Sequence, residues 1–277
     1  MSLWQYDFMR HALIAALVVG MTAPAVGVFL VQRRQALMGD GIGHVALTGV
    51  ALGFLLSTPP VLTAVIVAAA GAVLIEIVRE RGTTSGDLAL ALFFYGGIAG
   101  GVLLIGLAPG GTNANLLSYL FGSITSVSRS DLGVILALAL AVLLALAITG
   151  RELFAVCHDE EFARVSGLPV RLLNYLLAVL AAVTITVAMR VVGLLLVSAL
   201  MIVPVAIAQI FTRGFRQTVA VSLALGMTVA VTGVIVSYYG DVAPGACIVV
   251  LAVGLFLLAS LADSGLSGWM RRRRVAQ

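Results

Sequence analysis

Long stretches without a charged residue constrain this chain more than any other feature of its sequence. Residues 61–75, 132–148 and 248–262 contain no charged side chain. Apolar neighbours extend each stretch toward the roughly 20 residues that cross about 30 Å of hydrocarbon as a helix. Only 10% of the 277 residues are charged, whereas soluble domains carry about a quarter charged residues. The sequence therefore predicts an integral membrane protein that is all-α.

About nine apolar segments have the composition of membrane-spanning helices, with eight or ten as alternatives because two of them nearly touch at Arg190. The first segment is too long for a signal peptide and has no clear cleavage site, so we interpret it as a retained span. We expect residues 1–277 to form one polytopic transmembrane domain. The predicted spans are residues 11–31, 36–57, 60–78, 88–108, 132–150, 172–189, 192–211, 218–238 and 245–262.

The basic residues predict the orientation of these spans. All 16 are arginine, and cytoplasmic loops of membrane proteins carry an excess of positive charge. With the C-terminus in the cytoplasm and the N-terminus outside, every arginine is cytoplasmic except Arg10, Arg129 and Arg190. Two connections are long enough to have structure, an outer loop at 109–130 and an inner loop at 151–171.

The absence of lysine excludes one class of function. A phosphate-binding loop of the form G-x-x-x-x-G-K-[ST] requires its lysine, so this chain does not carry that ATPase site itself. The two cysteines, Cys157 and Cys247, lie in different environments and are separated by whole spans. They indicate neither a disulfide framework nor a metal-binding motif.

Asp40 and His44 are the polar residues that stand out inside a predicted span. They are four residues apart, so on a helix they share one face about one turn from each other. Counted at about 1.5 Å per residue from Arg34, His44 lies roughly 15 Å into the membrane and Asp40 roughly 9 Å. A charge at the bilayer centre costs at least about 2.5–3.5 kcal/mol, so both residues are candidates for function.

A carboxylate oxygen and an imidazole nitrogen suit zinc, manganese or ferrous iron, and the spacing of Asp40 and His44 allows both to reach one ion. Two ligands do not close a tetrahedral site, so a second copy of the chain or water has to supply the rest. The alternative is a structural hydrogen bond between Asp40 and His44 that holds two helices together.

Two other classes of function remain as alternatives at this point. A stand-alone secondary transporter or channel for a divalent cation is expected to place coupling carboxylates in several spans, but Asp40 is the only acidic residue well inside a predicted span. An intramembrane protease requires a second catalytic motif, such as another aspartate in a span, and the sequence provides none.

The inner loop contains a second pattern of interest. Glu161, Ala163 and Gly167 have the E-x-A-x-x-x-G spacing that is similar to the cytoplasmic coupling helix of ATP-binding-cassette importer permeases, and Glu160 adds a further carboxylate. A solvated acidic helix without a partner is the alternative interpretation.

Several ordered motifs together resemble one family along nearly the whole chain. This family is the ABC-3 type, the permease subunits of bacterial zinc and manganese ABC importers. The motifs are Arg33–Arg34 followed by Gly39, Asp40 and His44, then Glu161–Ala163 with Gly167, then Val191–Leu200 leading to Pro204, and finally Pro244–Gly245.

The resemblance implies a transport subunit in the bacterial cytoplasmic membrane that is not itself an enzyme and has no permanently bound cofactor. Its cargo would be a divalent metal ion, zinc or manganese and possibly iron, with Asp40 and His44 of two protomers facing each other across the pathway. The implied partners are a cytoplasmic ABC ATPase, an extracytoplasmic metal-binding lipoprotein, a second copy or a sister permease, and membrane lipid, but not nucleic acid. Glu160, Glu161, Ala163 and Gly167 would then belong to the contact with the ATPase, with residues 212–217 as a second candidate.

Overall fold

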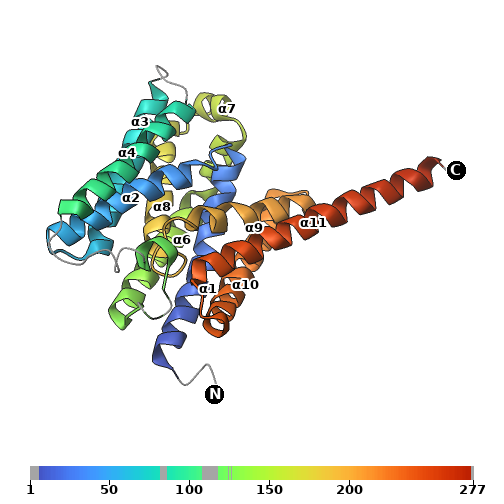
Figure 1. The fold of residues 1–277 in the computed structure, drawn as a ribbon. Helices are drawn as coiled ribbons and strands as arrows, with labels where there is room; N and C mark the ends of the chain where they lie inside the picture. Colours follow the sequence, from blue (N-terminus) through green and yellow to red (C-terminus); the bar gives the residue numbers. More distant parts are fainter. Residues whose placement is uncertain (1–5, 82–85, 108–117, 124, 126, 276–277) are drawn as a thin grey trace.

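The structure, a computed structural model, describes residues 6–81, 86–107, 118–123, 125 and 127–275, and the side chains of these residues except 86, 87 and 264–275. Throughout the described ranges the regular secondary structure is helical (Figure 1). The helices are α1 (Asp7–Gln32), α2 (Met38–Leu55), α3 (Pro60–Glu80), α4 (Gly86–Leu107), α6 (Arg129–His158), α7 (Glu160–Val165), α8 (Val170–Ala188), α9 (Val197–Phe211), α10 (Phe215–Gly240) and α11 (Pro244–Val275).

Eight of the described helices are long and apolar enough to cross a membrane, and α9 is a ninth, shorter apolar helix. The predicted all-α, polytopic fold is therefore confirmed. The predicted span at 192–211 differs in one respect, because its first residues are not in a regular helix and α9 begins only at Val197. In the predicted outer loop, residues 109–117 lie outside the described residues, and residues 118–121 form a helical turn.

Local sequence explains where several helices begin. Pro60 occupies the first turn of α3, where its missing N–H is tolerated. Ser128 caps α6 in a reciprocal arrangement with Asp131, in which each side chain accepts a hydrogen bond from the other residue's backbone N–H. The α6 helix continues to His158. The first part of the predicted inner loop at 151–171 is thus the end of this helix, and the connection to α8 is correspondingly shorter.

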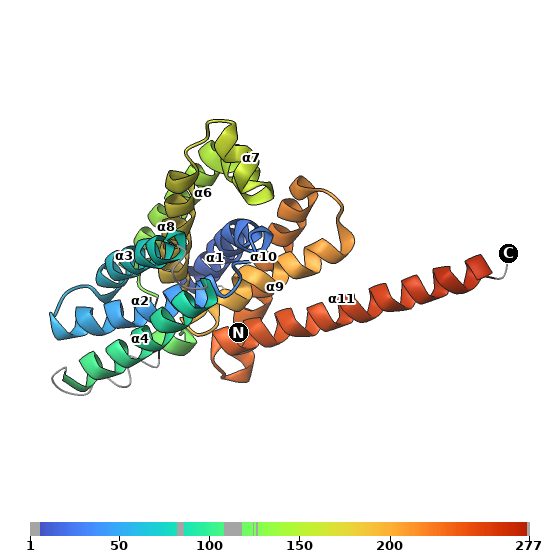
Figure 2. The ribbon, with the colours of Figure 1, turned by 90° about the horizontal axis from the view of Figure 1, so that it is seen from above.

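Helix α1 lies at the centre of the bundle, in contact with α6, α8, α9 and α10 (Figure 2). Small residues allow this close packing. A side chain on Gly27 would overlap the backbone of Met201 in α9, and one on Gly20 would overlap the backbone of Gly226 in α10. In the same way, Gly97 of α4 lies directly against the α2 backbone at His44. The bundle is therefore held by close backbone approaches as well as by apolar side chains.

An irregular segment between α8 and α9, residues 190–196, is largely buried in the bundle. Two of its backbone N–H groups pair with the helical turn at 118–121. The Leu194 N–H donates to the Tyr119 carbonyl at 2.8 Å and the Leu195 N–H donates to the Leu120 carbonyl at 3.2 Å. Gly193 has a left-handed φ of 85° and is in contact with the backbone of this turn. Irregular backbone that is buried in a helical bundle requires such pairing within the protein.

Candidate functional site

The first half of α2 carries the two candidate metal ligands. This helix packs against α3, α4 and α8. Asp40 lies in its first turn, where the positive end of the helix dipole stabilises a carboxylate. His44 follows one helical turn later, and both residues are partly buried. The structure thus places the pair on one helix, as the spacing predicts.

The His44 imidazole is packed but has no hydrogen-bonding partner at one nitrogen. The ring contacts Phe94 of α4 edge to face, with 4.2 Å between the ring centroids. Its Nδ1 atom is buried and makes no hydrogen bond. A buried polar atom without a partner costs free energy and calls for an explanation. This feature does not favour a structural hydrogen bond from Nδ1 to Asp40. An imidazole nitrogen that no other group occupies is the kind of atom that binds a metal ion in its unprotonated form.

The described part of one chain does not complete a metal site. No group of three or more His, Cys, Asp or Glu side chains comes together among the described residues. Asp40 and His44 therefore remain a pair of ligands, and the sequence-based expectation that the remaining ligands come from elsewhere stays a prediction.

The second predicted site is centred on α7, and the structure separates its four residues into different roles. Ala163 is completely buried. Gly167 ends the helix with a left-handed φ of 82°, and the Leu168 N–H donates back to the Ala163 carbonyl at 3.1 Å. This is the helix ending that glycine favours. Glu161 is exposed, whereas Glu160 takes part in ion pairs within the protein.

The outer surface of α7 has an apolar component that the sequence analysis did not identify. Phe162 is 69% exposed and Val165 is 88% exposed, and both lie on a helix of only six residues. With Glu161 they form the surface that we call the α7 patch. Exposed apolar side chains on a short amphipathic helix are typical of a protein contact. Periodicity does not reveal them, because α7 is too short for a pattern.

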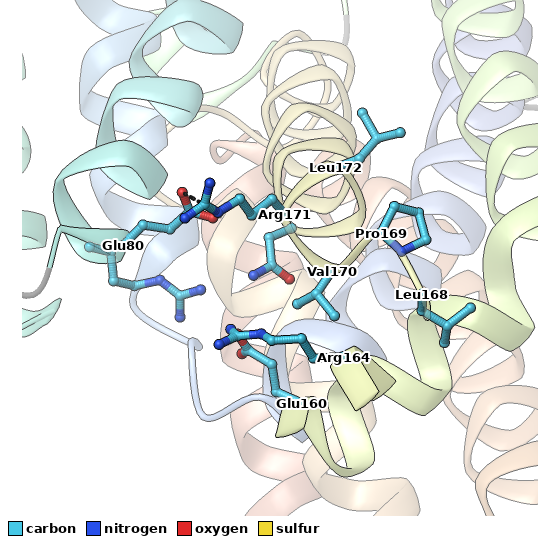
Figure 3. A pocket seen from close by; sticks show the side chains of 10 residues that line it. Glu80, Glu160, Arg164, Leu168, Pro169, Val170, Arg171 and Leu172 are labelled. Carbon is cyan, nitrogen blue, oxygen red and sulfur yellow. Dashed lines mark hydrogen bonds and ion pairs between the residues drawn. The ribbon is translucent and has the colours of Figure 1, made fainter. Parts of the chain in front are cut away.

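Glu160 pairs with two arginines, one at the end of α1 and one in α7 itself, Arg164, beside which it lies in Figure 3. Its carboxylate pairs with the Arg33 guanidinium at the end of α1 at 2.9 Å and with Arg164 of α7 at 3.2 Å. Arg33 also donates to the Asn174 side-chain oxygen of α8 at 2.7 Å. Glu160, Arg164 and Asn174 border a cavity of about 830 Å³ next to α7. Arg79, Glu80 and Arg171 also line this cavity. The sequence indicated Arg33 as a cytoplasmic charge and as part of a family motif, but not as a partner of Glu160.

A different ion pair lies at the opposite end of the bundle. Arg190 pairs with Asp131 of α6 and donates to the Tyr119 hydroxyl at 3.1 Å. Burial raises the pKa of Tyr119 above its usual value, and the nearby Arg190 opposes that rise. The pair fixes the junction between α6, the turn at 118–121 and the irregular segment. Asp131 was not a sequence candidate, because it lies at the start of a span and appears there as a capping residue.

Comparison with known proteins gives a consistent result. The sequence profile described as the ABC 3 transport family matches residues 5–263. The chain is 33% identical over 258 residues to the manganese import system permease protein ScaB of Streptococcus parasanguinis, which covers 93% of this chain and 91% of that protein. It is 35% identical to the manganese transport system membrane protein MntC of Halalkalibacterium halodurans, with 93% and 88% covered. Among solved structures it is similar to PsaBC from Streptococcus pneumoniae in complex with Fab, with a TM-score of 0.84, 33% identity and coverage of 93% and 92%.

Proposed function

This chain belongs to the ABC 3 transport family, and we propose that it is the membrane permease through which an ABC importer moves a divalent transition metal ion into the cytoplasm. One observation assigns the proposal to particular residues. The Nδ1 atom of His44 is buried and makes no hydrogen bond, and His44 lies one helical turn from Asp40. Manganese is the proposed cargo, because the ScaB and MntC relatives are named as manganese permeases. Zinc and ferrous iron suit the same ligands and are the alternatives to test.

We propose that the transit site is completed by a second permease, either another copy of this chain or a sister subunit. Asp40 and His44 offer only two ligands, and a second pair doubles that number. Helix α4, which covers α2 at Gly97, exposes large apolar residues on its other face, including Leu92, Tyr95 and Leu103. These residues face lipid or the second permease. An extracytoplasmic metal-binding lipoprotein would deliver the ion to the opposite end of the bundle from α7.

The distribution of arginines supports a cytoplasmic position for α7. Arg33, Arg79, Arg164 and Arg171 gather at the α7 end of the bundle. Arg190 lies at the other end beside Asp131. By the positive-inside rule the α7 end faces the cytoplasm, where an ABC ATPase is available to bind the α7 patch.

The proposed function is tested by reconstitution. The purified chain in vesicles is expected to move no Mn²⁺ against a gradient, because it lacks the lysine of a nucleotide site. Addition of the ATPase and metal-binding protein of the same system, with ATP, is expected to start uptake, with Zn²⁺ and Fe²⁺ measured in parallel. Uphill uptake by the chain alone would instead indicate a secondary transporter.

Changes in the α7 patch are expected to remove the ATPase without unfolding the permease. Glu161→Arg reverses an exposed charge and Phe162→Ser removes exposed apolar surface, so neither disturbs the core. Each variant is expected to lower capture of the ATPase in detergent by about tenfold, since a central contact residue contributes roughly 1–2 kcal/mol or more.

Glu152→Arg is the matched control, because Glu152 is also exposed but lies on α6. It is expected to retain the ATPase. If all three variants capture the ATPase as the unmodified chain does, the contact lies elsewhere. Residues 212–217, the connection between α9 and α10 with the first residues of α10, are then the next site to test.

A further inference from the structure

We infer that Arg33 is a positioning residue that connects the α7 helix to the metal-bearing helix α2, so that movement of α7 reaches the transit site through one guanidinium group. The inference rests on the proposed function, because it assigns α7 to the ATPase contact and Asp40 with His44 to the ion.

Arg33 joins three elements from an almost fully buried position. Its side chain is only 7% exposed. One terminal nitrogen donates to Glu160 in the first turn of α7 at 2.9 Å, and the other donates to Asn174 of α8 at 2.7 Å. The Asn174 residue is itself 4% exposed. Charge-assisted hydrogen bonds made from both ends of a planar guanidinium fix direction as well as distance, so Glu160 and Arg33 are held in one geometry.

The backbone then links Arg33 directly to α2. Arg33 follows the last residue of α1, and only residues 33–37 separate α1 from α2. This turn is tightly closed: the Gln35 N–H donates to the Leu30 carbonyl at 2.8 Å and the Met38 N–H to the Gln35 carbonyl at 3.0 Å. Arg34 within it has a left-handed φ of 57°, a conformation that ordinary residues adopt only when their surroundings impose it. A displacement of Arg33 is therefore passed to the first turn of α2, which holds Asp40.

A second ion pair of the same carboxylate provides a natural comparison. Glu160 also pairs with Arg164, but that arginine is 68% exposed and belongs to α7 itself. An exposed pair within one helix contributes little, about 0–1 kcal/mol, and joins α7 to nothing else. The two arginines thus bind one carboxylate, and only Arg33 connects it to the rest of the bundle.

The test uses the complete complex of permease, ATPase and metal-binding protein in vesicles. Uptake and ATP hydrolysis are measured on the same samples, together with ATPase capture and the melting temperature of the permease. For Arg33→Gln we expect normal ATPase capture and continued hydrolysis, with the number of ions moved per ATP lowered by about tenfold, a typical size for coupling between sites. Arg171→Gln removes an exposed ion pair with Glu80 outside α7, and it is expected to stay within about twofold of the unmodified chain.

A charge exchange distinguishes coupling from simple support of the fold. Arg33→Glu combined with Glu160→Arg restores the ion pair in the opposite direction, and the Asn174 amide is able to donate to the new carboxylate. This double variant is expected to recover most of the ions moved per ATP that Arg33→Glu alone loses. In addition, binding of ATP to the complex should change amide hydrogen exchange at residues 38–44 in the unmodified chain and leave it unchanged in Arg33→Gln.

Two results would overturn the inference while leaving the proposed function intact. One is a normal number of ions per ATP in Arg33→Gln. The other is a fall in uptake that follows a lower melting temperature and is not recovered by the charge exchange, which would make Arg33 a structural residue only. Failure of the unmodified complex to take up any metal would instead overturn the proposed function.

Discussion

Asp40→Asn and His44→Ala are each expected to lower metal uptake per folded transporter by about a hundredfold. The first keeps the shape of the side chain but removes the charge that offsets the ion, and the second removes the nitrogen donor. Loss of even an outer partner of a metal ligand commonly costs about 10–100-fold in affinity or activity. Uptake is measured in vesicles with the complete complex and divided by the amount of folded permease.

Thr48→Val is the matched control for these two variants. Thr48 lies one turn beyond His44 on α2 and donates a hydrogen bond to the Gly97 carbonyl of α4 at 2.8 Å. Its replacement removes a contact between the same two helices without removing a candidate ligand. We expect Thr48→Val to lower the melting temperature but to leave uptake per folded transporter nearly normal. If Asp40→Asn and His44→Ala behave like Thr48→Val, the pair is structural and the ion passes elsewhere.

The second large effect is expected from Gly193→Ala, on folding rather than on transport. Gly193 has a left-handed backbone and lies against the main chain of residues 120–122. An alanine there bears the left-handed strain of about 1–2 kcal/mol and also forces backbone to move, at a cost of about 1–3 kcal/mol more. We expect a clear loss of folded protein in the membrane and a lower melting temperature of what remains.

Two other glycines separate these contributions. Gly167 has a similar φ of 82°, but a side chain there meets open space, so Gly167→Ala is expected to show only the strain. Gly133 is in the α6 helix with open space around it, and its replacement is expected to be neutral or slightly stabilising. If Gly193→Ala is no more destabilising than Gly167→Ala, the close packing of the irregular segment is not important for stability.

The spans were predictable from sequence because hydropathy acts locally. Uninterrupted apolar runs such as residues 61–75 and 132–148 have one stable arrangement in lipid, and α3 and α6 contain them. Residues 190–196 show the limit of this reasoning. From Val191 onward these residues are as apolar as those of a spanning helix, so hydropathy alone assigned most of them to a span. Their actual conformation depends on the Tyr119 and Leu120 carbonyls, which are distant in the sequence.

The candidate sites also combine features that follow from local sequence with features that depend on residues distant in the sequence. The spacing of Asp40 and His44 gave their common face, because helix geometry relates near neighbours. The short motif at α7 gave the position of that helix. Glu160 of this helix pairs with Arg33, which is 127 residues away in the sequence. Arg33 in turn pairs with Asn174, which is 141 residues away. Neither pairing follows from a local sequence pattern. The exposure of Phe162 and Val165 is evident only from the structure, in which Ala163 is the buried residue of the helix.

The junction between residues 118–122 and residues 190–195 has a consequence for how the protein is made. The Leu194 and Leu195 N–H groups find their acceptors on residues that are synthesised before α6 and α8. These hydrogen bonds therefore form only after α6 and α8 have been synthesised, because residues 190–196 follow both helices in the chain. The junction thus cannot close until the ribosome has made about two thirds of the chain.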